Sequence, residues 1–382
     1  MSKAPASVVG IDLGCSTLKA VRLQKKGVQY ALVRIATLPN KRDPASQALP
    51  LEGDVAGQIK ELSSAVKASG ADVHYSINAL NSTVRYVELP NIQPDELRNN
   101  LKLNSTTYLR QSFDNYTFDA CALDAEALAA ASAKKAAKKG ASTVIHGKLK
   151  MLVGGMSTPE LSLYFHASRK AGIKPHSLQL ASVSLINAFE AAYPDIFKTQ
   201  AVTLLDIGFL SSSLTILDRG KPLLTRAVPL GGRQITDYLA QINGIDYAKA
   251  EIGKLKGELN IGEAIARTCV TLIREVHSSI NFFEKNSDLP ISKVYLSGAS
   301  TSSQAVVDAL SKDVGRACEA LDATAGLAVE LPADQQAVFA ASQAGFATAL
   351  GAARSYATIE AVVEKAAPAP KEKPTAIQKP AA

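Results

Sequence analysis

Apolar and polar residues alternate over several short stretches near the start of the chain, which is the pattern of half-buried β-strands. Successive strands are predicted across residues 8–36, and shorter ones at Val73–Ile77 and Val84–Glu88. Between them, residues 51–69 have the period of a helix and end at Gly70, a residue that commonly terminates helices. The first part of the chain therefore mixes strands with helices.

The same mixture continues to about residue 354. A strand hairpin covers residues 202–227 with its turn at Arg219-Gly220, and a short buried strand covers Lys293–Leu296. Further elements are predicted as a strand at Leu149–Val153 and as helices at Pro94–Leu109, Ser157–Ala171, Leu178–Ala192, from near Gln234, and at about 246–256, 262–286, 302–315 and 335–354. Helices interleaved with strands indicate an α/β fold.

One short sequence motif occurs twice, about two hundred residues apart. Each copy is an apolar strand, an Asp-apolar-Gly turn, a cluster of small hydroxyl residues and a second alternating strand. The first copy turns at Asp12-Leu13-Gly14 and the second at Asp206-Ile207-Gly208. Each predicts a β-hairpin whose tip carries a carboxylate and exposed backbone N–H groups. Two halves that open on the same hairpin predict a duplicated α/β domain with a cleft between the copies.

The net charge of +7 over 382 residues does not indicate a nucleic-acid-binding surface. Many of the basic residues lie in an Ala/Lys segment at about residues 127–143 and in an Ala/Pro/Lys tail at residues 365–382, which we expect to be flexible and disordered. The chain has no Trp and few other aromatic residues to stack on bases. We therefore expect no nucleic-acid partner, although the basic segments are compatible with anionic lipid headgroups.

The cysteines Cys15, Cys121, Cys269 and Cys318 are scattered along the chain. They lack the paired spacing of a zinc site, and they fit a reduced protein better than a disulfide framework. No apolar leader opens the sequence, and no apolar run is long enough to span a bilayer. We therefore expect a cytoplasmic protein.

The first hairpin tip has the parts of a phosphate-binding loop. Gly14 permits a tight turn whose following N–H groups can converge on phosphate oxygens. Asp12 can hold hydrated Mg²⁺, and Lys19 can reach the β- and γ-phosphates as a point charge. Taken alone, an Asp-x-Gly turn indicates no more than a hairpin.

Three later segments offer further parts of a nucleotide site. The second tip, up to Ser211, repeats the hydroxyl and N–H groups, but the bulky Phe209-Leu210 would crowd a phosphate. Glu251 and Lys254 share one helix face and can bind ribose hydroxyls and the adenine edge, or form a solvent-exposed ion pair. The small-residue turn at 296–300 can approach a purine or a phosphate closely.

The order of these segments resembles the actin-like ATPase superfamily. Within it the chain is most similar to the PilM family, the cytoplasmic actin-like component of type IV pilus assembly, and next to the cell-division protein FtsA. The most discriminating stretch is Gly220–Thr236. The other similar stretches are Gly10–Gly14, Leu204–Gly208, Ala250-Glu251, Arg274–Phe283, Val294–Gly298 and Ala349–Arg354.

The resemblance implies two duplicated actin-like (ribonuclease H-like) domains, at residues 8–200 and 201–354, with ATP in the cleft between them. A small subdomain would be inserted in the first, at about residues 76–150. Asp12 and Asp206 would hold Mg²⁺ through water. The implied phosphate-binding residues are Gly14, Cys15, Ser16, Thr17, Lys19, Gly208, Phe209, Leu210 and Ser211, and the implied nucleoside-binding residues are Gly231, Gly232, Glu251, Lys254, Gly298 and Ala299.

The resemblance also implies a partner. PilM-like proteins bind a short N-terminal peptide of a membrane-anchored PilN-like protein, in a groove beside the small subdomain. The chain would then be a scaffold that is peripheral to the inner membrane through this partner and contacts other pilus platform components. Gln179, at the start of a predicted helix, is either the side chain that orients a hydrolytic water or a plain surface residue. We expect hydrolysis to be slow or absent.

Two other functions on the same fold stay open. A small-molecule kinase needs a carboxylate base at the substrate hydroxyl. Asp72, Asp95, Asp114 and Asp119 are available for this role, but none of them lies in an evident catalytic motif. A division filament protein like FtsA would usually end in an amphipathic membrane-binding helix, and residues 368–382 do not have that pattern.

Overall fold

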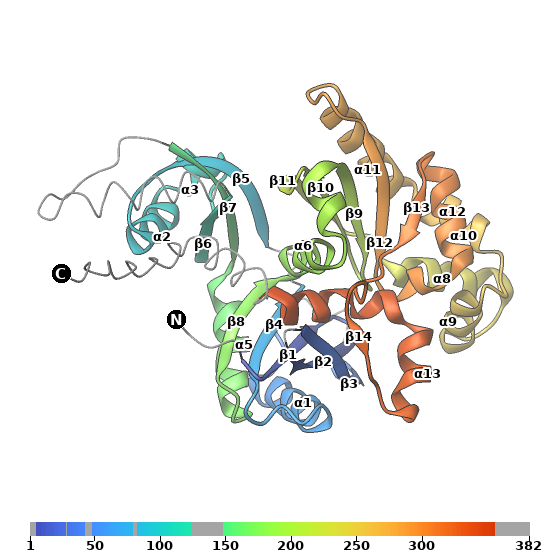
Figure 1. The fold of residues 1–382 in the computed structure, drawn as a ribbon. Helices are drawn as coiled ribbons and strands as arrows, with labels where there is room; N and C mark the ends of the chain where they lie inside the picture. The colour runs from blue at the N-terminus through green and yellow to red at the C-terminus, as the bar shows by residue number, and fades with distance from the viewer. Residues whose placement is uncertain (1–4, 28, 43–47, 79–81, 124–147, 356–382) are drawn as a thin grey trace, which may run out of the picture.

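The computed structural model describes residues 5–27, 29–42, 48–78, 82–123 and 148–355. Figure 1 shows two larger α/β halves packed against each other and a smaller α/β unit beside them. The expected Ala/Lys segment at 127–143 and the expected tail at 365–382 lie outside the described residues.

The bounds of the elements follow in chain order. The strands are β1 (Ser7–Leu13), β2 (Thr17–Lys26), β3 (Gln29–Pro39), β4 (Asp72–Ile77), β5 (Thr83–Pro90), β6 (Tyr116–Ala122), β7 (Lys148–Ser157), β8 (Pro175–Leu180), β9 (Ala201–Ile207), β10 (Ser212–Asp218), β11 (Lys221–Val228), β12 (Ile291–Ser297), β13 (Cys318–Ala320) and β14 (Ala328–Val329). The helices are α1 (Glu52–Ala65), α2 (Pro94–Leu103), α3 (Ser105–Leu109), α5 (Thr158–Lys170), α6 (Ala181–Ala192), α7 (Pro194–Thr199), α8 (Gly232–Asn243), α9 (Tyr247–Lys256), α10 (Ile261–Thr268), α11 (Val270–Glu284), α12 (Gln304–Val314) and α13 (Ala333–Ala341), with 3₁₀ turns η1 (Ala299–Ser302) and η2 (Gln343–Phe346) and a last helical stretch at 347–355.

The two large sheets have the same topology. Their strand orders are β3-β2-β1-β4-β8 and β11-β10-β9-β12-β13, and β14 extends the first sheet beside β3. In each half the opening strand pairs antiparallel with the second strand and parallel with the fourth. This repeated pairing confirms the predicted duplication of the fold.

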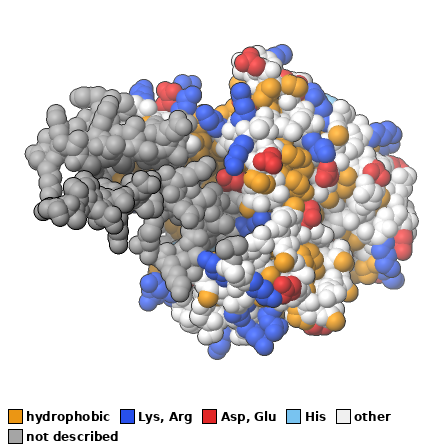
Figure 2. Space-filling model, viewed as in Figure 1, with side chains coloured by type: hydrophobic (Ala, Val, Ile, Leu, Met, Phe, Trp, Pro, Cys, Tyr) orange, Lys and Arg blue, Asp and Glu red, His pale blue; other side chains and the backbone are white. Residues whose placement is uncertain are grey.

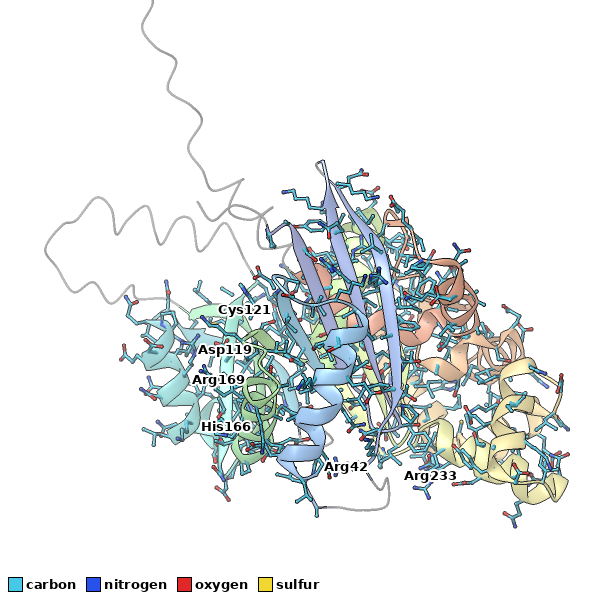
Figure 3. The ribbon with its side chains drawn as sticks, turned by 90° about the horizontal axis from the view of Figure 1, so that it is seen from below. Arg42, Asp119, Cys121, His166, Arg169 and Arg233 are labelled. Carbon is cyan, nitrogen blue, oxygen red and sulfur yellow. The ribbon has the colours of Figure 1, made fainter. Side chains whose placement is uncertain are left out.

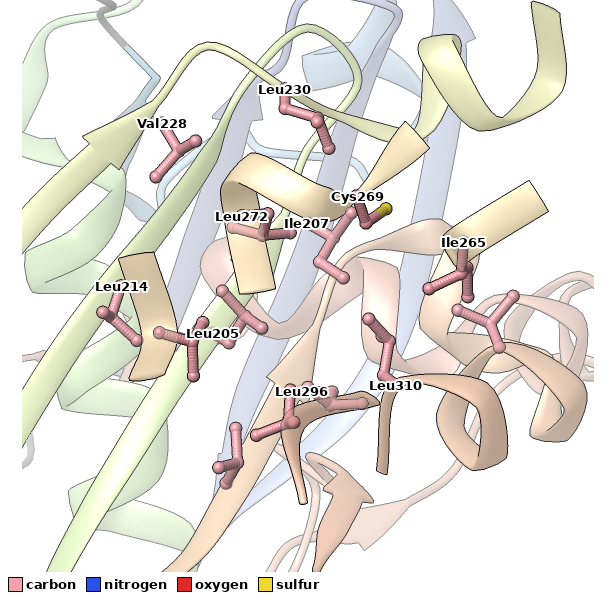
Figure 4. Packing of buried hydrophobic residues seen from close by; sticks show 14 of the residues in the cluster. Leu205, Ile207, Leu214, Val228, Leu230, Ile265, Cys269, Leu272, Leu296 and Leu310 are labelled. Carbon is pink, nitrogen blue, oxygen red and sulfur yellow. The ribbon is translucent and has the colours of Figure 1, made fainter. Parts of the chain in front are cut away.

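Burial explains why the opening strands read as nearly continuous apolar runs. All seven residues of β1 and all seven of β9 are buried, as expected for strands covered on both faces. The second half has its own core, which Figure 4 shows between β9, β10, β12 and the covering helices. A second core joins the halves, because it contains Val8 of β1, Val202 of β9, Phe189 of α6 and Leu350 of the last helical stretch. The shared core holds the two hairpins in one frame.

The smaller unit is a three-stranded sheet of order β5-β7-β6 with α2 and α3 on one side. It has a separate apolar core that includes Leu89, Leu101, Phe118 and Val153. Its strand β5 lies near β11 of the second half (Figure 1).

Most of the predicted strands and helices are confirmed, with a few differences. Residues 178–180, predicted as helix, complete β8, because they pair with β4 through Tyr75↔Leu178 and Ile77↔Leu180. The helices predicted at Pro94–Leu109 and 262–286 are each interrupted, at Asn104 and Cys269. The helix predicted at about 335–354 is likewise divided into α13, η2 and the last helical stretch. The strands β6, β13 and β14 were not predicted. In these strands, pairing with a distant segment overrides the local period.

Candidate nucleotide site between the two halves

The two hairpin tips meet in the middle of the molecule, and their carboxylates are buried. Asp12 is 7 % exposed and Asp206 is 8 % exposed. The register places Lys19 opposite Asp12 on the neighbouring strand, so the two side chains lie on one face of the sheet. The charge of Lys19 acts on both carboxylates, and the charge of Asp206 acts on Asp12. One lysine therefore lies between two acids from opposite halves.

Burial, together with the nearby charge of Asp206, raises the pKa of Asp12 from 3.8 to about 6, against the opposing effects of Lys19, Thr348 and Ser76. Burial also raises the pKa of Asp206, while Ser297 and Lys19 oppose that change. Both carboxylates are thus costly to keep ionised in the absence of a cation. A divalent cation between the tips would offset this cost, and carboxylates are ligands that Mg²⁺ prefers.

The first tip is a cradle that admits no side chain at Gly14. A Cβ there would lie 2.6 Å from the carbonyl oxygen of Thr17. Asn40, at the end of β3, holds the tip by donating its Nδ2 to the Gly14 carbonyl at 2.8 Å and its backbone N–H to the Ser16 carbonyl at 2.8 Å. Cys15 is half-buried in this tip, and burial raises the pKa of its thiol. The Cys15 thiol is therefore the neutral form at neutral pH.

The second tip repeats the cradle. A Cβ at Gly208 would lie 2.7 Å from the carbonyl oxygen of Ser211. The carbonyls of Gly208 and Phe209 accept from the N–H groups of Gly232 and Arg233 at 2.8 and 3.0 Å, at the start of α8. Phe209 and Leu210 are half-buried. The start of α8 therefore supports the second tip through backbone hydrogen bonds, as Asn40 supports the first tip.

The residues expected around the nucleoside converge from three segments. A Cβ at Gly232 would lie 2.6 Å from Oγ of Ser300 and 3.5 Å from Nζ of Lys254. Gly298 has a φ of 105°, and a Cβ there would lie 2.1 Å from the carbonyl oxygen of Ile207. Gly231, at the N-cap of α8, would place a Cβ 2.4 Å from the Phe209 carbonyl oxygen. Close backbone packing therefore requires glycine at Gly231 and Gly298, whereas Gly232 leaves room for the Ser300 side chain.

The pair Glu251–Lys254 is not the solvent-exposed ion pair that the sequence allowed. Lys254 is 1 % exposed, and its Nζ donates to Glu251 Oε2 and Thr236 Oγ1, both at 2.7 Å, and to the Gly232 carbonyl at 3.3 Å. Glu251 is half-exposed. Lys254 therefore fixes the Glu251 carboxylate and the start of α8.

Gln179 directly precedes Leu180, the N-cap of α6, as predicted, but it is not a free surface side chain. It lies at the end of β8, two strands from Asp12 through Ser76. Its Nε2 donates to Ser177 and Ser355 at 2.9 and 2.8 Å, and its Oε1 accepts from Ser184 and Asn187 at 3.3 and 3.2 Å. The amide is therefore held in place by four neighbouring side chains.

Sequence reasoning missed several residues that shape this site. Ser76 and Ser297 are the equivalent partners of Asp12 and Asp206 on the adjacent parallel strands. Thr236 hydroxyl joins Glu251 and Lys254, and Asn40 supports the first tip. The register of the duplicated strands is the signal that would have found the two serines. Nothing local in the sequence marks the other two.

Comparison with known proteins identifies the family. Residues 10–356 match the family model described as type IV pilus assembly protein PilM. The chain belongs to the PilM family. A solved structure of a PilM–PilN type IV pilus biogenesis complex is similar at 23% identity and a TM-score of 0.71, over 91% of this chain and 98% of that one.

Two other solved structures are more distant. The ethanolamine utilization protein EutJ from Carboxydothermus hydrogenoformans is similar at 15% identity and a TM-score of 0.48, over 92% of this chain and 90% of that one. An activator of 2-hydroxyisocaproyl-CoA dehydratase from Clostridium difficile with bound ADPNP is similar at 12% identity and a TM-score of 0.42, over 94% of this chain and 97% of that one. The family membership and the fold shared with the PilM–PilN complex confirm the expected actin-like architecture.

A groove of about 430 Å³ lies between the small sheet and the first half. Five consecutive residues of β6, from Thr117 to Cys121, line it. Because alternate strand residues point to opposite faces, a run of consecutive lining residues means that the strand edge faces the groove. Figure 3 shows Asp119 and Cys121 on β6 beside α5, which carries His166 and Arg169. The opposite wall is apolar and includes Leu161, Leu178 and Val183.

A cluster of charged side chains lies along the groove, which Arg98 and Asp119 help to line. Arg98 pairs with Asp119 at 3.0 Å and with Asp95 at 2.7 Å. The side chains of this cluster are exposed, so its ion pairs add little to the stability of the fold. Among the described residues, no helix is long and apolar enough to cross a membrane.

Proposed function

We propose that this chain is a cytoplasmic ATP- and Mg²⁺-binding scaffold of type IV pilus assembly, which attaches to the inner membrane through a PilN-like partner. The observation that carries the nucleotide part is the meeting of Asp12, Asp206 and Lys19 between two glycine cradles from opposite halves.

The residues present fit a magnesium nucleotide. Asp12 and Asp206 would hold Mg²⁺ through water, and the ion would supply charge neutralisation for the phosphates. Lys19 and the N–H groups that follow Gly14 and Gly208 would orient the phosphates. Gly232, Glu251 and the Gly298–Ala299 turn would position the nucleoside. Closing the cleft around the nucleotide would bring the halves together without requiring turnover.

We propose that the groove beside β6 holds the N-terminal peptide of the PilN-like partner. An extended peptide can add a strand to the β6 edge, which gives affinity through main-chain hydrogen bonds. Its apolar side chains would lie against the wall formed by Leu161, Leu178 and Val183. Other platform components would be reached through this membrane-anchored partner.

The nucleotide proposal is tested by thermal unfolding of the full chain with and without ATP·Mg²⁺. A ligand that binds the native state raises the melting temperature, so we expect a clear rise for the wild type and none for Asp12→Asn or Asp206→Asn. Asp195→Asn, on the exposed surface of α7, is the matched control and should behave as the wild type. A wild type that shows no rise would reject the nucleotide site.

The partner proposal is tested by fluorescence anisotropy with a labelled N-terminal peptide of a PilN-like protein. Cys121 is exposed and lines the groove, so Cys121→Glu should keep the fold and weaken binding about tenfold or more. Leu103→Glu, on the far exposed face of α2, is the control and should bind normally. Equal binding by both variants would place the peptide elsewhere.

Turnover is expected to be slow or absent. A hydrolytic site needs a group free to orient the attacking water, and the Gln179 amide is engaged by four side chains. Phosphate release measured over hours should therefore show little product, and Gln179→Ala should not lower it further. A rate that falls sharply in Gln179→Ala would show that this amide does take part.

A further inference from the structure

A second cleft, of about 490 Å³, lies between the small sheet and the second half. Its lining includes the consecutive runs 84–86 on β5, 211–213 at the start of β10 and 223–227 on β11. Since alternate residues of a strand point to opposite faces, the consecutive runs on β5 and β11 indicate that the edges of these two strands border the cleft, and the start of the interior strand β10 lies at its end. The cleft is distinct from the groove beside β6.

Both bordering strands have an open edge within the part of the chain that the structure describes. β5 is the outermost strand in the order β5-β7-β6, and β11 is the outermost strand in the order β11-β10-β9-β12-β13. The two strands lie near each other (Figure 1) but form no ladder. An open edge presents a row of N–H and C=O groups that can pair with an added strand.

The charged residues that line the cleft indicate which kind of ligand it would bind. Arg85 lies on the β5 side and Arg226 on the β11 side, and no Asp or Glu is among the described residues that line the cleft. Hydroxyl side chains of Ser211, Ser213 and Thr225 add hydrogen-bonding groups. Figure 2 shows Lys and Arg side chains on the part of the surface where β10 and β11 lie in Figure 1. An acidic ligand is therefore favoured over a basic or an apolar one.

Arg226 is held at the wall of the cleft by an ion pair with α11. Its Nη1 donates to Glu275 Oε2 of α11 at 2.8 Å. A guanidinium has five N–H donors in a planar fork, so one such pair leaves donors for a second carboxylate. The ion pair with Glu275 therefore orients the Arg226 guanidinium and leaves N–H donors for a second carboxylate.

We propose that this cleft binds an extended, acidic segment of a partner protein, which adds a strand to β11 and places a carboxylate between Arg85 and Arg226. The segment would tie the small sheet to the second half. It would also contact Ser211–Ser213, on the strand that leaves the second hairpin tip. This inference goes beyond the proposed function, because it requires neither the nucleotide nor the peptide in the β6 groove.

The probe is a capped, fluorescein-labelled hexapeptide of alternating Glu and Val residues, titrated with the full chain and followed by anisotropy. We expect it to bind, and Arg85→Gln and Arg226→Gln each to weaken it about tenfold, because each removes a charge-assisted hydrogen bond. Arg169→Gln, exposed on α5 and outside this cleft, is the control and should bind as the wild type. Melting temperatures verify that the variants fold. If Arg226→Gln does not fold, Arg226→Lys replaces it in the titration.

Two further measurements separate strand addition from charge alone. The same peptide N-methylated at alternate residues keeps its charges but loses N–H donors, so we expect it to bind at least tenfold more weakly. Hydrogen exchange should slow at the β11 amides, residues 221–228, when the unmodified peptide is bound. Equal binding of the methylated peptide, equal binding of a Lys–Val peptide, unchanged exchange at β11 or no binding at millimolar peptide would each overturn the proposal.

Discussion

The two hairpin tips share a backbone and differ in what supports them and in what charge they carry. Each tip has an Asp at the end of a buried strand, a glycine that excludes a side chain and a serine on the adjacent parallel strand. The position opposite the Asp is Lys19 in the first tip and Ser213 in the second. The first tip is held by the side chain of Asn40, and the second by the start of α8.

The duplication therefore preserved the strand framework of the two tips, whereas the two copies supply different charged groups. Both copies supply a carboxylate, but only the first supplies a cation, which acts on both carboxylates. The second copy instead joins its tip to the segments expected around the nucleoside, through Gly232 and Lys254. The following predictions test this division, from the largest expected effect to the smallest.

The largest effect on stability is expected at Gly10, two residues before Asp12, because the opening strands β1 and β9 differ at this position. Gly10 in β1 packs against the last helical stretch, and a Cβ there would lie 2.0 Å from the Ala349 carbonyl oxygen, whereas Leu204 fills the equivalent place in β9. Gly10→Val should lower the free energy of unfolding by about 4 kcal/mol or more, or abolish folding. Chemical denaturation measures this.

Gly57→Ala is the control for that measurement. Gly57 lies in α1 with open space around its Cβ position, so alanine should stabilise the protein by about 0.5–1 kcal/mol. A Gly10→Val protein as stable as the wild type would show that β1 and β9 are packed more alike than the structure has them.

The next effect concerns the cost of the first carboxylate without a bound cation. Because the pKa of Asp12 is raised to about 6 from 3.8, its protonated form is favoured in the folded state, and stability falls as the pH rises through this window. Asp12→Asn should therefore stabilise the ligand-free protein by about 3 kcal/mol at pH 7. The gain should shrink as the pH is lowered toward 4.

Asp206→Asn should act in the same direction, because the pKa of Asp206 is also raised. Urea unfolding in a metal-chelating buffer at several pH values measures both variants. A loss of stability in Asp12→Asn at pH 7 would mean that Lys19 more than compensates the buried charge.

The division of charge predicts unequal effects of substituting the residues opposite the two acids. Lys19→Met should weaken ATP·Mg²⁺ binding about 10- to 100-fold, because a charged partner of the phosphates is removed. Ser213→Ala should change the affinity by less than about threefold. Isothermal titration gives both dissociation constants. Comparable losses for the two variants would show that both tips contribute to charge stabilisation equally.

The smallest effect is expected two residues before the paired serines, at His74 in β4 and Tyr295 in β12. His74 is buried, its Nδ1 lies 2.8 Å from Ser177 Oγ, and its pKa is lowered to about 4 by burial and by the nearby His176, with Asp72 opposing. Because the unfolded chain takes up a proton near pH 6.5, stability from neutral His74 is lost as the pH falls below that value.

Between pH 7 and pH 5.5 this loss should be about 1 kcal/mol. In His74→Phe that contribution to the pH dependence should vanish, as at the equivalent Tyr295. The difference between the wild type and His74→Phe isolates it from the opposite trend of Asp12. Parallel pH profiles of the two proteins would contradict the lowered pKa.

The sequence by itself determined the elements that have a local period and the two Asp-x-Gly tips. Strands β1, β2, β9 and β10 are legible because burial on both faces or on one face dictates which side chains they carry. The repetition of this pattern was sufficient to predict a duplicated α/β fold and the meeting of Asp12 with Asp206. The resemblance to the PilM family was legible for the same reason.

Only the tertiary structure decided how the other side chains are used. The interior place of Lys254, the four contacts of Gln179 and the support of the first tip by Asn40 all depend on segments far apart in the chain. The edges of β6 and β11, and hence both clefts, depend on which strands end each sheet. Local sequence patterns record whether a residue is buried, but long-range contacts choose its neighbours, because strand pairing and core packing are settled between elements rather than within them.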